Sequence, residues 1–248
     1  MRAGRLGAGG RSLEWAIWGK GPPRIVLLHE GLGSVGLWRG FPEALAGRTG
    51  LAVLAYSRAG HGRSDPAELP RPLDYMTREA GVLGEVLEAA GFEEGWIAGH
   101  SDGATIAAIH AGTDPHPGLR GAVLMAPHFF TEEMGLASIA GARARFEAEL
   151  RGRMARHHDD AEATFRGWSD AWLDPGFRDW DVGHVIPRIR VPVLAVQGRE
   201  DPYGTLAQID ALDAATGPVS KLVLEGCGHA PHLERPAETL EAVADFCR

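Results

Sequence analysis

The sequence is poor in cysteine, in long apolar runs and in clustered basic residues. Only Cys227 and Cys247 are cysteines among 248 residues, too few for a disulfide framework and without metal-ligand spacing, so we expect two free thiols. The net charge of −8 argues against a nucleic-acid partner, because a phosphate backbone attracts a clustered positive surface. No run approaches the ~20 apolar residues of a membrane-spanning helix, so we expect no membrane partner.

The first ten residues also lack the apolar core of a signal peptide. We therefore expect a cytoplasmic protein. Hydrophobic residues make up 44% of the chain and charged residues 23%, as in ordinary globular proteins. A chain of this length is expected to form one large α/β domain, or one such domain with an inserted segment.

Short apolar runs alternate with helical segments along most of the chain. Helical patterns occur near residues 41–47 and along an apolar face that ends at Gly91. Continuous apolar runs between such segments are typical of strands buried on both faces of a parallel sheet. The pattern therefore predicts an α/β fold with a doubly wound, mostly parallel sheet. The expected buried strands lie at residues 24–28, 51–56, 96–98, 121–126, 191–198 and 221–224.

Another strand is expected ahead of these runs. Residues 13–19 alternate between apolar and polar side chains, and residues 19–23 form a cluster of glycine and proline typical of a turn. This order predicts a hairpin or an adjacent pair with the strand at 24–28.

A long polar and aromatic region interrupts the alternation after residue 127. It lacks the β-branched runs that mark sheet strands. We predict that residues 1–127 and 186–248 form the core and that residues 128–185 form a helical lid inserted in it, within one domain overall. The aromatic residues of the predicted lid include Phe165, Trp168, Trp172, Phe177 and Trp180.

Residues 99–103, Gly-His-Ser-Asp-Gly, have the pattern of a nucleophile elbow. The pattern is informative only between a strand and a helix, because the serine must occupy a sharp, strained turn. An apolar run precedes it and a run of small residues follows it, so this context is present. Gly99 and Gly103 leave room in the crowded turn. A chance match in a chain with 34 glycines is the alternative, but we interpret Ser101 as a nucleophile.

A serine hydroxyl needs a histidine base and an acid that orients the base. Asp201 follows the expected strand that ends at Gly198, and His229 follows the next expected strand. The carboxyl ends of parallel strands lie at one edge of a sheet, so Ser101, Asp201 and His229 can meet there.

Each of these two assignments has a competitor. Glu200 could replace Asp201 as the acid, but Pro202 gives Asp201 a rigid turn that fixes its direction. His232 could replace His229, but His229 occupies the more flexible, glycine-flanked position directly after the strand. We therefore favour Asp201 and His229.

Residues 157–160, His-His-Asp-Asp, could suggest a metal site. Nothing else in the chain completes a coordination shell, so a solvated helix turn is the favoured interpretation. We expect neither a metal nor an organic cofactor.

Two backbone N–H groups are expected to stabilise an oxyanion. One belongs to Asp102, directly after the serine. The other comes from the loop at residues 29–34, after the strand at 24–28, where we select Gly31.

These residues resemble the α/β-hydrolase superfamily, in particular its lid-bearing serine hydrolases, which include esterases, enol-lactonases and carbon–carbon bond hydrolases. The resemblance implies Ser101 as nucleophile, Asp201 as acid, His229 as base and a lid inserted after residue 126. Serine at the elbow distinguishes the chain from the dehalogenase and epoxide-hydrolase branches, which use a carboxylate. The motifs that carry the resemblance are residues 27–31, 57–64, 99–103, 198–202 and 228–236.

One position departs from the family pattern. Relatives commonly have His-Gly where this chain has His29-Glu30. Either Glu30 points to solvent or pairs with Arg58, or Glu30 and Asp102 make the mouth of the substrate pocket acidic. The residues expected to line that pocket are Glu30, His128, Phe129, Phe130, Trp168 and Trp172.

The sequence therefore predicts a serine hydrolase that cleaves a small ester or lactone through an acyl-enzyme. One alternative is a carbon–carbon bond hydrolase or lyase that acts on a vinylogous diketone acid, whose carboxylate needs a cationic partner. A second alternative is a ligand-binding protein that retains the triad. The lid arginines that could serve the first alternative are Arg143, Arg145, Arg151, Arg153 and Arg156.

Overall fold

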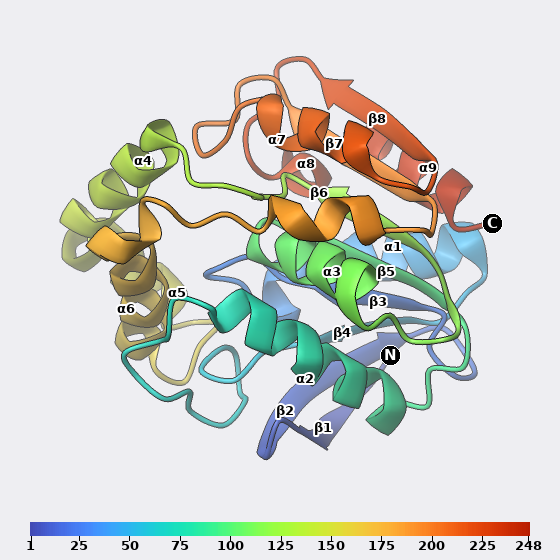
Figure 1. Cartoon of the computed structure of the whole chain (residues 1–248). Coiled ribbons are helices and arrows are strands. Elements are labelled where there is room, and N and C mark those ends of the chain that lie inside the picture. The colour runs from blue at the N-terminus through green and yellow to red at the C-terminus, as the bar shows by residue number, and fades with distance from the viewer.

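The computed structural model describes residues 1–248, and its eight strands form one sheet in the order β1-β2-β4-β3-β5-β6-β7-β8 (Figure 1). Every pair from β4 to β8 along this order is parallel, and only β1 and β2 run antiparallel to their neighbours. The predicted doubly wound, mostly parallel sheet is confirmed. The strands are β1 (Arg2–Ala8), β2 (Arg11–Trp18), β3 (Ile25–Leu28), β4 (Val53–Tyr56), β5 (Gly95–His100), β6 (Leu119–Met125), β7 (Val193–Gly198) and β8 (Val219–Leu224).

The expected pairing of residues 13–19 with the strand at 24–28 was wrong. β2 pairs with β4, where Trp15 lies opposite Tyr56, so β4 separates β2 from β3. The other neighbour of β2 is β1, which was not expected from the sequence. β1 is an edge strand whose residues are mostly exposed. Because main-chain hydrogen bonds hold it in the sheet, its sequence does not show the apolar pattern that predicts a strand.

Helices cover both faces of the sheet. α2 (Tyr75–Ala89) and α3 (Asp102–Thr113) cover the face turned toward the viewer in Figure 1, while α1 (Phe41–Thr49) and α9 (Pro236–Phe246) pack together on the other face. Alternate residues of β3 enter two separate apolar clusters, one on each side of the sheet. The short elements are α7 (Ala207–Asp210), α8 (Pro231–Glu234) and 3₁₀ turns at Val35–Trp38, Pro175–Phe177, Gly183–Arg188 and Ala211–Ala214.

The chain between β6 and β7 contains helices and, apart from one isolated bridge, no strand pairing. It includes α4 (Glu133–Ala144), a π-helical turn at Phe146–Leu150, α5 (Arg151–Met154) and α6 (Ala161–Trp172). α4, α5 and α6 gather on one side of the molecule, at the left of Figure 1. The function of this segment as a lid stays a prediction.

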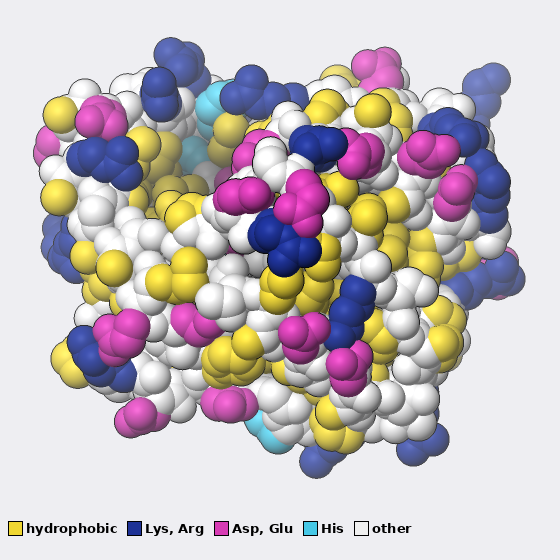
Figure 2. Space-filling view, turned by 90° about the horizontal axis from the view of Figure 1, so that it is seen from above, with side chains coloured by type: hydrophobic (Ala, Val, Ile, Leu, Met, Phe, Trp, Pro, Cys, Tyr) yellow, Lys and Arg dark blue, Asp and Glu magenta, His cyan; other side chains and the backbone are white.

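Charges of both signs cover the face of the molecule that is seen from above in Figure 2. Figure 2 shows Lys and Arg interspersed with Asp and Glu, so the face in view carries no patch of one sign. No helix combines the length and the apolar character needed to cross a bilayer.

The junction between β5 and α3 is packed too closely for side chains at its glycines. A Cβ atom at Gly99 would overlap the backbone of Gly103, and a Cβ atom at Gly103 would overlap the carbonyl group of Leu28 on β3. α3 can therefore begin close against the sheet, directly after Ser101.

Adding a methyl group at Gly103 should force this junction apart. Gly103→Ala is expected to lower the free energy of unfolding by about 1–3 kcal/mol, the usual cost of overpacking. Gly141→Ala is the matched control, because Gly141 is an exposed residue of α4 and no other atom lies within 4 Å of the place that a Cβ atom would take. It should stabilise the protein by about 0.5–1 kcal/mol. Urea unfolding measures both values, and equal stabilities of Gly103→Ala and the wild type would contradict the packing argument.

Candidate active site

Ser101 stands on a strained turn between β5 and α3. Its φ of 53° and ψ of −121° are rare for a residue with a side chain. The backbone is held from both sides, because the Ser101 N–H donates to the Met125 carbonyl at 2.9 Å and the Ser101 carbonyl accepts from the N–H groups of Ala104 and Thr105. The side chain is 6% exposed and lines a cavity.

The structure brings Ser101, His229 and Asp201 together. His229 Nε2 lies 2.9 Å from Ser101 Oγ, and His229 Nδ1 lies 2.8 and 2.9 Å from the two Asp201 oxygens. The Tyr203 N–H and the Gln197 side-chain amide also donate to this buried carboxylate, each at 2.8 Å. A proton on Nδ1 therefore faces Asp201, which leaves Nε2 free to accept the proton of the serine hydroxyl.

Neither competing residue takes part in this chain of hydrogen bonds. The Glu200 carboxylate is turned away and accepts the Cys227 N–H at 2.9 Å. The His232 ring packs against Trp38 and His100, with ring centroids 4.8 and 5.0 Å apart, and its Nδ1 has no hydrogen-bond partner. The geometry favours Asp201 and His229, the residues selected from the sequence.

Further histidines surround His229. His100 Nε2 lies 2.6 Å from the His229 carbonyl oxygen, a distance at which an Nε2–H group donates, and the His128 ring centroid lies 5.6 Å from that of His229. Burial lowers the pKa of His128 to about 3 and that of His232 to about 4. These rings are therefore neutral near pH 7 and add no positive charge next to the proposed base.

The two residues expected to supply oxyanion donors, Gly31 and Asp102, line the same cavity. Asp102 is the first residue of α3, so its N–H has no acceptor inside the helix. The Gly31 N–H has no acceptor within the protein. Gly31 lies beneath Trp168, and a Cβ atom there would overlap the indole ring. Only glycine fits this position in the loop.

The carboxylate of Asp102 is buried beside the cavity. Tyr75 donates its hydroxyl to Asp102 Oδ2 at 2.5 Å, and Trp172 Nε1 donates to the Tyr75 oxygen at 3.0 Å. Asp102 Oδ1 is buried without a partner. Burial, and then the charge of Asp102, raise the pKa of Tyr75 well above its usual value.

Glu30 also lines the cavity. Its carbonyl oxygen, rather than its carboxylate, accepts from Arg58 Nη2 at 3.0 Å. Burial raises the pKa of the Glu30 carboxyl, and the negative charge of Asp102 raises it further. The expectation that Glu30 points to solvent or pairs through its carboxylate with Arg58 was wrong. The structure favours the acidic pocket mouth.

The cavity has a volume of about 220 Å³. Phe129 and Phe130 do not line it, contrary to expectation, because they continue the chain into the core: Phe129 is fully buried there, and Phe130 forms a bridge with Asp181. Tyr203 was missed, although its place two residues after Asp201 was a usable signal. The lining residues are Glu30, Gly31, Leu32, His100, Ser101, Asp102, His128, Gly135, Ile139, Trp168, Trp172, Tyr203, His229 and Ala230.

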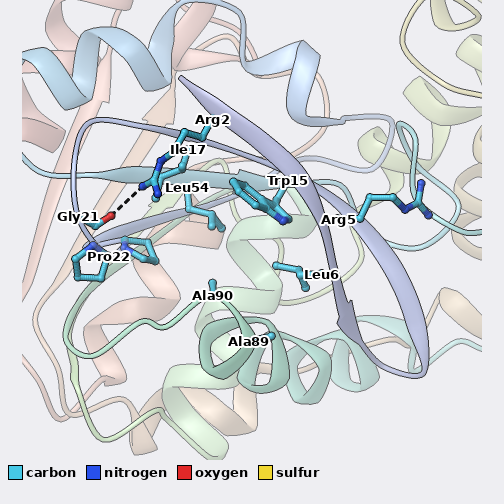
Figure 3. A pocket seen from close by; sticks show the side chains of 11 residues that line it. Arg2, Arg5, Leu6, Trp15, Ile17, Gly21, Pro22, Leu54, Ala89 and Ala90 are labelled. Carbon is cyan, nitrogen blue, oxygen red and sulfur yellow. Dashed lines mark hydrogen bonds between the residues drawn. The ribbon is translucent and has the colours of Figure 1, made fainter.

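A second hollow, of about 490 Å³, lies between the β1–β2 hairpin and the end of α2 (Figure 3). Its arginines already have partners, since Arg2 donates to the Gly21 carbonyl and Arg5 pairs with Asp65. The lining contains no serine, cysteine, histidine or carboxylate. It therefore offers none of the groups that hydrolysis needs.

The expected solvated turn at residues 157–160 was wrong for His158. This side chain is 2% exposed, and both of its ring nitrogens contact backbone groups. Asp160 caps α6 by accepting the Ala163 N–H. No group of three or more His, Cys, Asp or Glu side chains is arranged to hold a metal ion.

Comparison with known proteins shows that the chain is similar to hydrolases. The model of the alpha/beta hydrolase family matches residues 25–242. The putative carbamate hydrolase RutD of Azorhizobium caulinodans is 40% identical over 99 residues, which cover 40% of this chain and 35% of RutD. The human serine hydrolase BPHL is 25% identical over 209 residues, covering 82% of this chain and 71% of BPHL. The aligned region thus spans about a third of RutD.

Solved structures share the fold across the whole chain. The enol-lactonase from Burkholderia xenovorans LB400 superposes with a TM-score of 0.75 at 21% identity, covering 98% of this chain and 99% of that one. A meta-cleavage product hydrolase from Pseudomonas fluorescens IP01 gives 0.74 at 20% identity, covering 98% and 96%. At these identities the likeness shows the fold alone.

The buried histidines should make stability depend on pH. His232 has a folded pKa of about 4 against 6.5 for an unperturbed ring, so below pH 6.5 the unfolded chain binds a proton that the folded protein does not. Stability therefore falls as the pH drops from 6.5 toward 4. His232→Phe keeps the ring packing and should reduce this slope by up to about 1.4 kcal/mol per pH unit.

Urea unfolding between pH 7.5 and 4.5 measures that slope. His184→Gln is the control, because the His184 side chain is exposed, and it should retain the wild-type slope. Identical slopes for the wild type and His232→Phe would show that His232 is not buried in its neutral form.

Proposed function

Because the chain belongs to the alpha/beta hydrolase family, we propose that it is a serine hydrolase that cleaves a small ester or lactone. The observation that carries the proposal is the chain of hydrogen bonds from Ser101 Oγ through His229 to Asp201, at the wall of a cavity of about 220 Å³. A strained, buried serine within hydrogen-bond distance of a histidine is the arrangement that nucleophilic catalysis needs.

The proposed reaction has two halves. Ser101 Oγ attacks the substrate carbonyl carbon while His229 Nε2 takes the hydroxyl proton, and Asp201 stabilises the resulting imidazolium. The tetrahedral oxyanion accepts hydrogen bonds from the N–H groups of Gly31 and Asp102. His229 then returns the proton to the leaving alcohol oxygen, which gives an acyl-enzyme. In the second half, water attacks the acyl carbon while His229 takes a proton from the water. His229 then gives that proton to Ser101 Oγ as the acyl–oxygen bond breaks, which releases the carboxylic acid and restores the serine hydroxyl.

The charge of the cavity favours an uncharged substrate over a diketone acid. Glu30 and Asp102 both line the cavity, and no lysine or arginine does. Arg143, Arg145 and Arg151 form surface ion pairs instead, with Asp170, Glu149 and Glu147. The other two lid arginines, Arg153 and Arg156, are exposed. A substrate carboxylate would therefore meet like charges and no cationic partner, which disfavours the carbon–carbon bond alternative.

We also propose that residues 128–185 act as a lid over a core made of residues 1–127 and 186–248. Trp168, Trp172 and Ile139 of this segment line the cavity beside residues of the core. This placement supports a role for the lid in shaping the acyl and alcohol sites.

A panel of substrates tests the proposal. It contains p-nitrophenyl esters of rising chain length, a set of lactones and a meta-cleavage diketone acid. Esters or lactones should be turned over fastest, and Ser101→Ala should lose this turnover by several orders of magnitude. Preferred turnover of the diketone acid would establish the first alternative. Stoichiometric binding without turnover would establish the ligand-binding alternative.

The identity of the acid can be tested by two neighbouring variants. Asp201→Asn removes the carboxylate that holds the His229 tautomer and should lower kcat by roughly 10³- to 10⁴-fold. Glu200→Gln changes the adjacent exposed carboxylate and should stay within about twofold of the wild type. Steady-state kinetics on a p-nitrophenyl ester measure both, and a larger loss in Glu200→Gln would move the acid by one residue.

The negative charge of Glu30 should select against anionic substrates. Glu30→Gln is expected to raise kcat/KM for a p-nitrophenyl succinate monoester relative to the butyrate ester by about fivefold, the equivalent of ~1 kcal/mol of repulsion. Glu241→Gln, a change at an exposed residue of α9, is the control. It should leave the ratio of the two kcat/KM values unchanged. An unchanged ratio in Glu30→Gln would mean that this carboxylate does not act on the substrate.

A further inference from the structure

Residues 30–33, here called the oxyanion turn, form a β-turn after β3. The Gly33 N–H donates to the Glu30 carbonyl at 3.1 Å and closes the turn. Gly31 and Leu32 occupy its centre, and neither has a positive φ. Their N–H groups have no acceptor within the protein, and both residues line the cavity. The turn therefore keeps unpaired donors beside Ser101.

Buried side chains hold the carbonyl groups of this turn from behind. The Glu30 carbonyl accepts from Arg58, and the Gly31 carbonyl lies 3.0 Å from His61 Nε2. His61 Nδ1 lies 3.1 Å from the Ala59 carbonyl oxygen and 3.4 Å from Arg71 Nη2. Because Arg71 Nη2 already donates to that carbonyl at 2.9 Å, we assign the His61 proton to Nε2, which faces the Gly31 carbonyl. Neither Arg58 nor His61 lines the cavity.

These anchors determine where the N–H groups point. In a trans peptide unit the C=O and N–H groups point in opposite directions. Because the carbonyls of Glu30 and Gly31 are drawn toward side chains outside the cavity, the N–H groups of Gly31 and Leu32 turn toward it. Flipping the central peptide would require a positive φ at Leu32, which leucine disfavours.

The last anchor comes from a distant part of the chain. His158 lies between α5 and α6, where its Nδ1 accepts the Gly62 N–H at 3.0 Å. The proton therefore lies on Nε2, which is 2.9 Å from the Leu32 carbonyl oxygen and donates to it. The same segment of the chain carries Trp168, whose ring covers Gly31.

We infer that His158 is a positioning residue for hydrolysis: by holding the Leu32 carbonyl, it fixes the oxyanion turn and ties its orientation to the helices between β6 and β7. This inference rests on the proposed function, because it assumes that the turn stabilises an oxyanion. His158 does not line the cavity, so it would increase the rate of hydrolysis through the oxyanion turn and not by contact with the substrate.

Other contacts keep the helical segment attached when His158 is changed. Thr164 Oγ1 donates to the Gly60 carbonyl at 2.6 Å, and the Asp159 N–H donates to the Gly62 carbonyl at 3.0 Å. Arg63 and Asp159 form an ion pair at the same place. Variants of His158 are therefore expected to fold, and the effect of losing the Leu32 contact can be measured.

Two amide variants separate the roles of the two ring nitrogens. His158→Gln can keep a donor near the position of Nε2, whereas His158→Asn can keep only an acceptor near the position of Nδ1. Each variant loses one hydrogen bond, so their stabilities should be similar. We expect His158→Asn to lower kcat by about 10-fold with KM nearly unchanged, and His158→Gln to stay within about threefold of the wild type.

Two measurements test whether His158→Asn is slower than His158→Gln. Both are normalised to the concentration of titrated active sites. One is the split between kcat and KM on a p-nitrophenyl ester. The other is the rate at which a fluorophosphonate labels Ser101, because its phosphoryl oxygen occupies the same oxyanion position as the substrate. His157→Asn, a neighbouring change with no contact to the turn, is the control and should match the wild type.

The outcomes distinguish this inference from the proposed function. Equal kcat values and equal labelling rates for the Asn and Gln variants, with only their melting temperatures lowered, would overturn the positioning role. If the wild type is labelled at Ser101 but hydrolyses no ester or lactone, the proposed function fails while the order of labelling rates still decides the role of His158. A wild type that is not labelled would overturn both.

Discussion

The left-handed backbone at Ser101 is the constraint on which the rest of the site depends. A conformation of this kind costs about 1–3 kcal/mol for a residue with a side chain and persists only where its surroundings hold it. Here β6 accepts the Ser101 N–H, and the close contacts of Gly99 and Gly103 press α3 against the sheet. Ser101 Oγ is thereby presented beyond the ends of the strands, 2.9 Å from His229 Nε2.

Around the turn at Ser101, charged side chains and neutral hydrogen-bond donors occupy different places. The histidines packed near His229 are buried and neutral, so the Asp201 carboxylate is the charged group that contacts the base. Negative charge reappears on the cavity wall at Glu30 and Asp102. The expected oxyanion donors are backbone N–H groups without a net charge, and the carbonyl groups of the oxyanion turn are held by side chains behind it. A negative charge that develops near Ser101 is therefore met by backbone dipoles, while an anionic substrate is disfavoured.

Much of this site could be predicted from the sequence because its signals are local. The elbow has a fixed five-residue pattern, and Asp201 and His229 follow apolar runs whose carboxyl ends must share one edge of a parallel sheet. The missed features are not local. β1 is held by main-chain pairing at an edge, and His158 reaches Leu32 across 126 residues of sequence. Phe129 lies in an irregular segment and points away from the cavity. The sequence of such a segment has no periodic pattern from which side-chain directions could be predicted.

The central claim is that Ser101 forms a covalent acyl-enzyme. Rapid acid quenching of the wild type during turnover of a p-nitrophenyl ester, followed by mass spectrometry, tests it most directly. If Ser101 is the nucleophile, the peptide that contains Ser101 gains the mass of the acyl group less one hydrogen. This adduct appears with the first turnover and decays when substrate is exhausted. Two results would contradict a covalent acyl-enzyme on Ser101. One is a burst of p-nitrophenol without any adduct, and the other is an adduct on a different residue.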